Sequence, residues 1–260
     1  RHICLLNLNV KKITTKEVPM NLPRVAICWS GQLRTGLRAV PYLLRFFEDI
    51  KNVDHFYHSW DDGQPQEDWD KLNEMLNPVA SFVETPWKHR GFCGNMLHSI
   101  QQSNRLKRTH ELNKKFRYDI VIKCRFDLLV PIHKRWKYFD VVDRSIYYSI
   151  GNNGLVLTDF ATHGFSDLIY WGNSHAMDII SDSYRYYNWK LMPKQLTCLT
   201  GGNIDPEDTM YSPGTIMYQL GQRYNLRMIQ IEPQLGETLW RTSVKDLDPY
   251  LDWDEIRSAY

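Results

Sequence analysis

The stretch "YDIVIKCRFDLLVP", residues 118–131, decides the fold because it combines a buried-strand composition with a polar face. Its apolar residues are mostly of kinds that prefer strands, whereas Lys123, Arg125 and Asp127 interrupt it at every second position. Alternate residues of a strand point to the same side. The pattern therefore predicts a buried strand that ends with two cations and a carboxylate on one face.

Strand and helix patterns alternate along the chain before this stretch. The expected elements are a strand over 24–31, a helix over 37–50 that starts or kinks at Pro41, a strand over 53–60, a helix over 66–76, a strand over 79–85 and a helix over 95–117. Strands that alternate with helices predict an α/β fold with a mainly parallel central sheet flanked by helices on both faces.

The pattern changes after residue 131. The expected elements there are a strand over 145–150, a strand over 167–173 that runs into a helix, a helix opened by Asp205 and Pro206, and a strand over 226–233. We interpret residues 20–260 as one domain with two halves, about 24–131 and about 132–260. Met20 precedes the first clean strand and could be a true start, in which case residues 1–19 are an N-terminal extension or a fragment of something longer.

Composition limits the classes of function. The chain has 260 residues, 43% of them hydrophobic, which suffices for a sizeable core. A net charge of +2 does not suggest a polyanion binder, and the basic run at 105–117 is typical of a solvated helix face, so no nucleic-acid partner is expected. Five widely spaced cysteines without a CxxC motif argue against disulfides and structural zinc, and indicate a reducing compartment. No apolar run approaches the ~18 residues of a membrane span.

Ligands of parallel α/β sheets bind outside the carboxyl ends of the strands. The polar residues at these predicted ends are Ser30, Gly31, Gln32, His58, Trp60, Asp61, Arg125 and Asp127. The loop "WSGQLRTG", residues 29–36, adds Arg34 and precedes a helix N-terminus, which favours anions. It matches neither a dinucleotide fingerprint nor a Walker loop, so an ordinary strand–helix turn is the alternative.

Two acidic positions each have two interpretations. Asp127, at the end of a buried strand, must be paired or metal-bound; it could hold Mg²⁺ or Mn²⁺, or form an ion pair with Arg125 or Lys123. Glu207 and Asp208 fall in the first turn of a predicted helix. The helix dipole alone favours acidic residues at this position. The functional alternative is that one of them acts as a base or contacts the acceptor hydroxyl. The histidines show no metal-ligand spacing, and only His58 is kept as a candidate.

Five segments, in this order, resemble nucleotide-sugar glycosyltransferase-like proteins of bacterial surface-polysaccharide loci and of large viruses and phages. They are "ICWSGQLRTG" (27–36), "HSWD" (58–61), "YDIVIKCRFDLLVP" (118–131), "SDLIYWGNSHAMDII" (166–180) and "PEDTMY" (206–211). The resemblance covers about residues 24–232. It implies a Rossmann-like GT-A fold, with a half that binds a nucleoside-diphosphate sugar followed by an acceptor half. We expect a protein of the cytoplasm, or of the host cytoplasm if viral.

The resemblance also implies roles for single residues. Gly31, Gln32 and Arg34 would line the nucleotide, Asp167 would lie on the acceptor side, and Glu207 would be the base or an acceptor contact. The family's Asp-x-Asp metal motif falls on residues 125–127, where only Asp127 is kept. Arg125, in place of the first aspartate, could itself neutralise phosphate, which leaves dependence on Mn²⁺ or Mg²⁺ open.

The expected activity is therefore sugar transfer, hexosyl or pentosyl, from a nucleoside-diphosphate sugar to an acceptor hydroxyl, on a glycan by preference. Two alternatives remain. One is another nucleotide-dependent transferase, such as a nucleotidyltransferase. Against it, the loop over 29–36 is poor in glycine, and Asp127 is a single acid where such enzymes usually have a pair. The other is a non-catalytic module that binds a nucleotide sugar or a carbohydrate.

Overall fold

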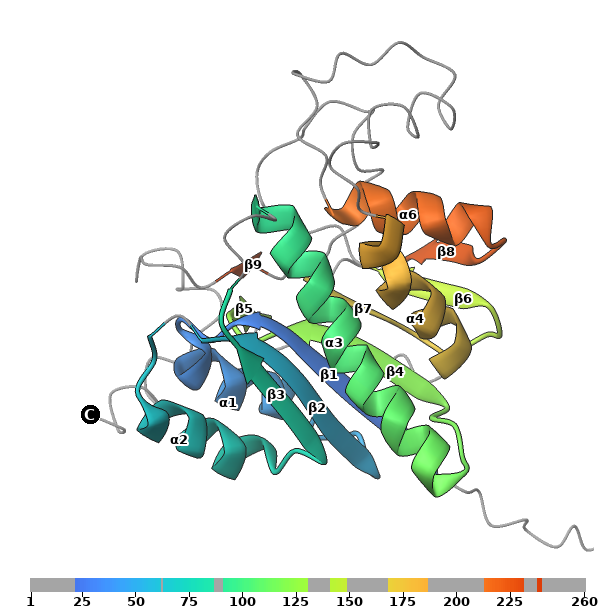
Figure 1. The fold of residues 1–260 in the computed structure, drawn as a ribbon. Helices are drawn as coiled ribbons and strands as arrows, with labels where there is room; N and C mark the ends of the chain where they lie inside the picture. The colour runs from blue at the N-terminus through green and yellow to red at the C-terminus, as the bar shows by residue number, and fades with distance from the viewer. Residues whose placement is uncertain are drawn as a thin grey trace, which may run out of the picture.

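A seven-stranded sheet in the order β3-β2-β1-β4-β7-β6-β8 forms the centre of the molecule (Figure 1). The computed structural model describes residues 22–61, 63–86, 91–130, 141–148, 168–186, 213–231 and 238–239. The strands of the sheet are β1 (Val25–Gln32), β2 (Val53–Trp60), β3 (Ala80–Glu84), β4 (Ile120–Arg125), β6 (Ser145–Tyr148), β7 (Ile169–Gly172) and β8 (Arg227–Gln230). All adjacent pairs are parallel except those that β7 makes with β4 and β6. The mainly parallel α/β fold predicted from the sequence is confirmed.

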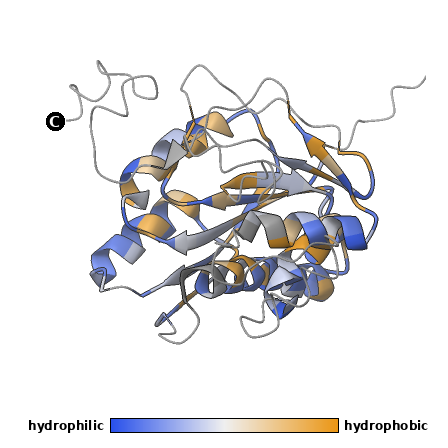
Figure 2. Ribbon diagram, turned by 90° about the horizontal axis from the view of Figure 1, so that it is seen from above, coloured by the Kyte–Doolittle hydropathy of each residue, from blue (hydrophilic) through white to orange (hydrophobic). Residues whose placement is uncertain are grey.

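Helices cover both faces of this sheet. The described helices are α1 (Gly36–Phe46), α2 (Gln66–Leu76), α3 (Gly91–Lys114), α4 (Ser174–Ser181), the 3₁₀ helix η1 (Asp182–Tyr186) and α6 (Pro213–Arg223). The core under α1 and α2 takes Ile27 and Trp29 of β1, and the core under α3, α4 and α6 takes Ala26 and Cys28. This alternation follows from the two-residue period of a strand. In Figure 2 the strands are largely pale or hydrophobic, whereas the helices mix hydrophilic and hydrophobic segments.

The observed elements agree with most of the sequence-based boundaries. The helix over 66–76 has the predicted limits, and α1 continues through Pro41 rather than starting there. Helix α3 starts four residues earlier than expected, at Gly91. A small sheet of β5 (Leu128–Leu129) and β9 (Thr238–Leu239) was not predicted. The helix start predicted at residues 205–206 lies outside the described residues, and so do residues 1–19.

The opening stretch divides at a turn. Strand β4 ends at Arg125, Phe126 and Asp127 form the turn, and β5 follows. Phe126 is fully buried and stacks on Trp29, with ring centroids 6.0 Å apart and 14° between the planes. Tyr57 meets the same ring edge-on at 5.9 Å. These aromatic contacts anchor the turn, which contains Asp127, to the core.

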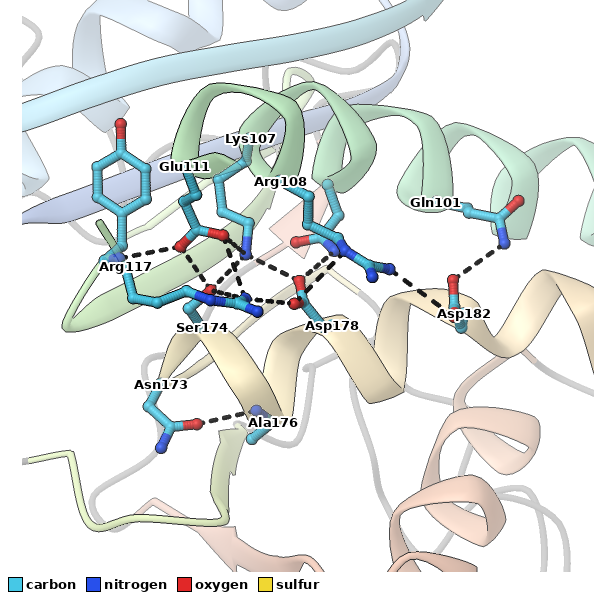
Figure 3. Close-up of polar contacts among 12 residues, drawn as sticks. Gln101, Lys107, Arg108, Glu111, Arg117, Asn173, Ser174, Ala176, Asp178 and Asp182 are labelled. Carbon is cyan, nitrogen blue, oxygen red and sulfur yellow. Dashed lines mark hydrogen bonds and ion pairs between the residues drawn. The ribbon is translucent and has the colours of Figure 1, made fainter. Parts of the chain in front are cut away.

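A buried polar network joins α3 to α4 (Figure 3). The ammonium group of Lys107, a fully buried residue, lies 2.9 Å from Asp178, 3.2 Å from Glu111 and 2.6 Å from the Ser174 hydroxyl. Arg117, which follows α3 in the chain, lies 2.7 Å from Asp178. Burial alone would raise the pKa of Asp178, but the charge and hydrogen bonds of Lys107 and its neighbours lower it on balance. These compensated charges connect the two helices.

Gly172 allows β7 to pack closely against its neighbour. A Cβ atom at this position would lie 2.6 Å from the carbonyl oxygen of Ser145, which is backbone and cannot move away easily. We expect Gly172→Ala to lower the free energy of unfolding by about 1–3 kcal/mol, as overpacking does, measured by urea denaturation. Gly221→Ala in α6 is the control.

At Gly221 the closest atom is the sulfur of Met228, at the flexible end of a side chain, and alanine also favours the helix. The control should therefore cost less than Gly172→Ala. An equal or larger loss in Gly221→Ala would contradict the assignment of the effect to the Ser145 backbone.

Candidate functional site

Three adjacent strands bring several of the predicted site residues to one edge of the sheet. The register pairs Ser30 of β1 with His58 of β2 on one side and with Arg125 of β4 on the other. Gln32 pairs with Trp60 at the end of the same two strands. Because β1, β2 and β4 are parallel, these residues all lie at or near the carboxyl ends, where ligands of such sheets bind.

A pocket of about 80 Å³ opens at this edge. Its lining residues are Gly31, Gln32, Arg34, Trp60, Pro86, Asn95, Met96 and Arg125. Five of them were predicted as cofactor-binding residues from the sequence. The volume is below the roughly 300–1,000 Å³ of a site that encloses a drug-sized ligand.

A second pocket, of about 260 Å³, lies against the α3–α4 network. It is lined by Arg108, Arg117, His175, Asp178, Ile179, Asp182, Tyr186 and Tyr224. None of these residues was a candidate from the sequence. We place the candidate site at the smaller pocket because it occupies the carboxyl edge and contains the predicted residues.

Two arginines and one carboxylate determine the charge of the carboxyl-edge pocket. Asp127 is buried, and its two oxygens lie 2.8 and 2.9 Å from Nε and Nη2 of Arg125. Arg34 adds a longer contact of 3.4 Å to the same carboxylate, with a third of its side chain exposed. Two positive charges face one negative charge, so this group carries a formal excess of one positive charge that suits an anion.

The ion pair bears on the metal prediction for Asp127. Sequence reasoning left a metal ligand and a structural ion pair as alternatives, and here both carboxylate oxygens accept hydrogen bonds from Arg125. The geometry matches the ion pair. Lys123, the third polar residue of the stretch, instead contacts the Leu168 carbonyl oxygen at 3.4 Å and lies over the Tyr170 ring. The metal-ligand role of Asp127 stays a prediction.

Gly31 provides the sharp turn at the end of β1. Its φ of +114° is strained for other residues, which explains glycine at this position. Its N–H donates to the Ser99 hydroxyl at 2.8 Å, and its carbonyl accepts a hydrogen bond from Ser59. The N–H of Gly31 is therefore used within the protein, and the arginines are the better anion-binding groups.

His58 belongs to a polar cluster behind the pocket. Its Nδ1 lies 2.9 Å from the Ser99 hydroxyl, and its Nε2 lies 3.0 Å from a Glu84 oxygen. His98 Nε2 reaches the same Glu84 oxygen at 2.7 Å. Burial lowers the pKa of His58 to about 4, despite the opposing effect of Glu84. Trp60 stacks on His98, with ring centroids 5.5 Å apart, and also lines the pocket.

Sequence reasoning missed Glu84, His98 and Ser99 as members of this cluster. Glu84 ends the third predicted strand, so the rule that found His58 could have found it too. The two remaining residues lie on α3, and their approach depends on how that helix crosses the sheet. Asp167 and Glu207, the predicted acceptor-side and base residues, lie outside the described residues.

The fold and pocket define a Rossmann-like α/β protein with an anion-suited pocket at the carboxyl edge of its sheet. Comparison with protein-family models and with curated proteins found no match. Among solved structures, the chain is similar to a "putative nucleotide-diphospho-sugar transferase" from Desulfovibrio desulfuricans G20. That similarity has a TM-score of 0.42 at 9% identity, over 80% of this chain and 79% of that one, too low to support a functional argument. No helix among the described residues is long and apolar enough to cross a membrane.

Proposed function

We propose that the protein transfers a sugar from a nucleoside-diphosphate sugar to an acceptor hydroxyl, on a glycan by preference, in the cytoplasm. One observation carries this proposal: five residues selected from the sequence for nucleotide-sugar binding line the same pocket at the carboxyl edge. The pocket combines an aromatic ring, Trp60, with the two guanidinium groups of Arg34 and Arg125.

The arrangement suits the charge that develops in such a reaction. When the glycosidic bond of the donor breaks, the leaving diphosphate gains negative charge, and fixed cationic groups stabilise it. Arg125 is held in place by its paired hydrogen bonds to Asp127, and Arg34 is more exposed and can turn toward a ligand. In this proposal Asp167 and Glu207 serve the acceptor side, with Glu207 as base. A Mn²⁺ or Mg²⁺ ion held by Asp127 would have to displace the contact with Arg125.

The alternative of a non-catalytic binding module predicts the same pocket without turnover. Release of nucleoside diphosphate in the presence of acceptor sugars separates the two possibilities. Binding without release in every donor–acceptor combination would favour the module.

The first test is thermal stability with a panel of nucleotides and UDP- and GDP-sugars, with and without Mn²⁺. A ligand that binds the native state raises the melting temperature by mass action; at a hundred times Kd the gain is about 2.7 kcal/mol. We expect a shift with one nucleotide sugar, and we expect Arg34→Gln to weaken that binding about tenfold, because it removes a charged contact of roughly 1.5 kcal/mol.

Arg38→Gln is the matched control, since Arg38 is exposed on α1 and is not among the pocket residues. It removes the same charge four residues away and should leave binding unchanged. No shift with any nucleotide, or an equal loss in both variants, would overturn the proposal.

A further inference from the structure

The cluster behind the pocket has the composition of a metal site. The Nε2 atoms of His58 and His98 lie 3.0 and 2.7 Å from the same oxygen of Glu84. The three candidate ligand atoms all lie within 4.8 Å of one another. Two imidazoles and a carboxylate are the protein ligands of many zinc sites that keep one position open for water.

The separations between these atoms are close to those that a bound ion needs. Zinc lies about 2.0–2.1 Å from nitrogen and oxygen ligands, so two ligands of a tetrahedral site are about 3.3 Å apart. The observed separations from Glu84 are a few tenths of an ångström shorter. A small outward rotation of the carboxylate would therefore make room for an ion.

The surroundings also prepare the ligands. His58 is fully buried, with both ring nitrogens directed at polar groups of the cluster. Ser99 lies 2.9 Å from the other ring nitrogen of His58 and orients the ring, as outer-shell partners of metal-bound histidines do. The Glu84 side chain is one-fifth exposed, which gives an ion a way in from solvent.

We propose that His58, Glu84 and His98 bind a divalent first-row transition-metal ion, for which Zn²⁺ is the best match. Imidazole nitrogen suits zinc and its neighbours, whereas Mg²⁺ and Ca²⁺ prefer all-oxygen sites. The ion joins β2, β3 and α3, which contribute one ligand each. The site is distinct from Asp127 and does not depend on the proposed transferase activity.

The site is connected to the pocket by two contacts. Trp60 lines the pocket and stacks on His98. Ser99 contacts His58 and also accepts the hydrogen bond of the Gly31 N–H, which belongs to the turn at the pocket. The bound ion therefore stabilises one wall of the pocket from behind rather than contacting a ligand within it.

The test uses the whole chain, stripped with a chelator and dialysed against Zn²⁺, Mn²⁺ or Mg²⁺, followed by elemental analysis and thermal unfolding. We expect one Zn²⁺ per chain and a higher melting temperature with zinc, and no gain with Mg²⁺. Glu84→Gln and His98→Gln should each lower zinc affinity at least about a hundredfold, and Ser99→Ala about 10–100-fold, the usual effect of an outer-shell partner.

His175→Gln is the control, because His175 is exposed on α4, away from the cluster. It should bind zinc like the unchanged protein. The proposal is overturned if the unchanged protein retains no zinc, which is decided without any variant, or if His175→Gln loses zinc as Glu84→Gln does. Nucleotide binding is read separately, so failure of the zinc site and failure of the transferase proposal are distinguishable.

Discussion

Replacing Lys107 with methionine is expected to lower the free energy of unfolding by about 3–5 kcal/mol, the usual cost of removing one partner of a buried ion pair. Lys107 is fully buried between Glu111, which is 2% exposed, and Asp178, which is 8% exposed. Methionine fills a similar volume but leaves both carboxylates short of their cation. Arg117 still reaches them, at 3.3 and 2.7 Å, but its side chain is more than half exposed and compensates less.

The measurement is urea denaturation followed by circular dichroism. Lys114→Met is the control, since it is the same substitution at an exposed position of the same helix, and should change stability by less than about 0.5 kcal/mol. Adding Glu111→Gln to Lys107→Met should cost less than the sum of the two single changes. A loss in Lys107→Met no larger than in Lys114→Met would show that the network does not stabilise the contact between α3 and α4.

The second large effect is a loss of stability in mild acid. Burial lowers the pKa values of His55 and His58 from 6.5 to about 4 in the folded protein. Both imidazoles are neutral above pH 6.5 whether the chain is folded or not. Between pH 6.5 and 4 the unfolded chain takes up protons that the folded protein does not, so unfolding becomes easier as the pH falls. Each histidine contributes on the order of 3 kcal/mol over this window.

The acid effect is checked by denaturation at several pH values with a chelator present, so that no metal competes with protons. His55→Asn retains an acceptor for the Trp29 indole N–H, which lies 3.1 Å from His55 Nδ1. In this variant the number of protons taken up on unfolding, given by the slope of the unfolding free energy against pH, should fall by about one. The lowered pKa of Asp178 acts below this window and does not confuse the result. Stability that stays constant from pH 6.5 to 4 would contradict the pKa shifts.

The alternation of elements could be read from the sequence because burial imposes a period on each of them. The helix over 66–76 was placed correctly because its buried residues, Trp69, Leu72 and Leu76, recur at helical spacing. Strand order is a different matter. Nothing in the local pattern of Ile169–Gly172 shows that β7 enters antiparallel beside β4, because such pairing depends on the path of the whole chain.

The candidate site divides in the same way. The rule of strand ends brought Gly31, Gln32, Trp60 and Arg125 to one pocket from sequence alone. It could not decide what Asp127 contacts, because a buried carboxylate is expected both for a metal ligand and for an ion pair with arginine. Nor could it reveal the cluster of His58, Glu84 and His98, whose members are 26 and 14 residues apart on three different elements.

The stacked ring of Phe126 has a consequence for affinity. Arg125 and Asp127 flank this buried ring, and their own paired hydrogen bonds hold the guanidinium in one orientation. The conformational entropy of Arg125 is thus lost when the chain folds, and an arriving anion has little left to order there. Arg34 is one-third exposed and retains more rotamers, so most of the remaining ordering cost of binding falls on it. In the proposed nucleotide-sugar site, Arg125 would serve as a preorganised anchor, and Arg34 as the partner whose rotamer adjusts to the ligand.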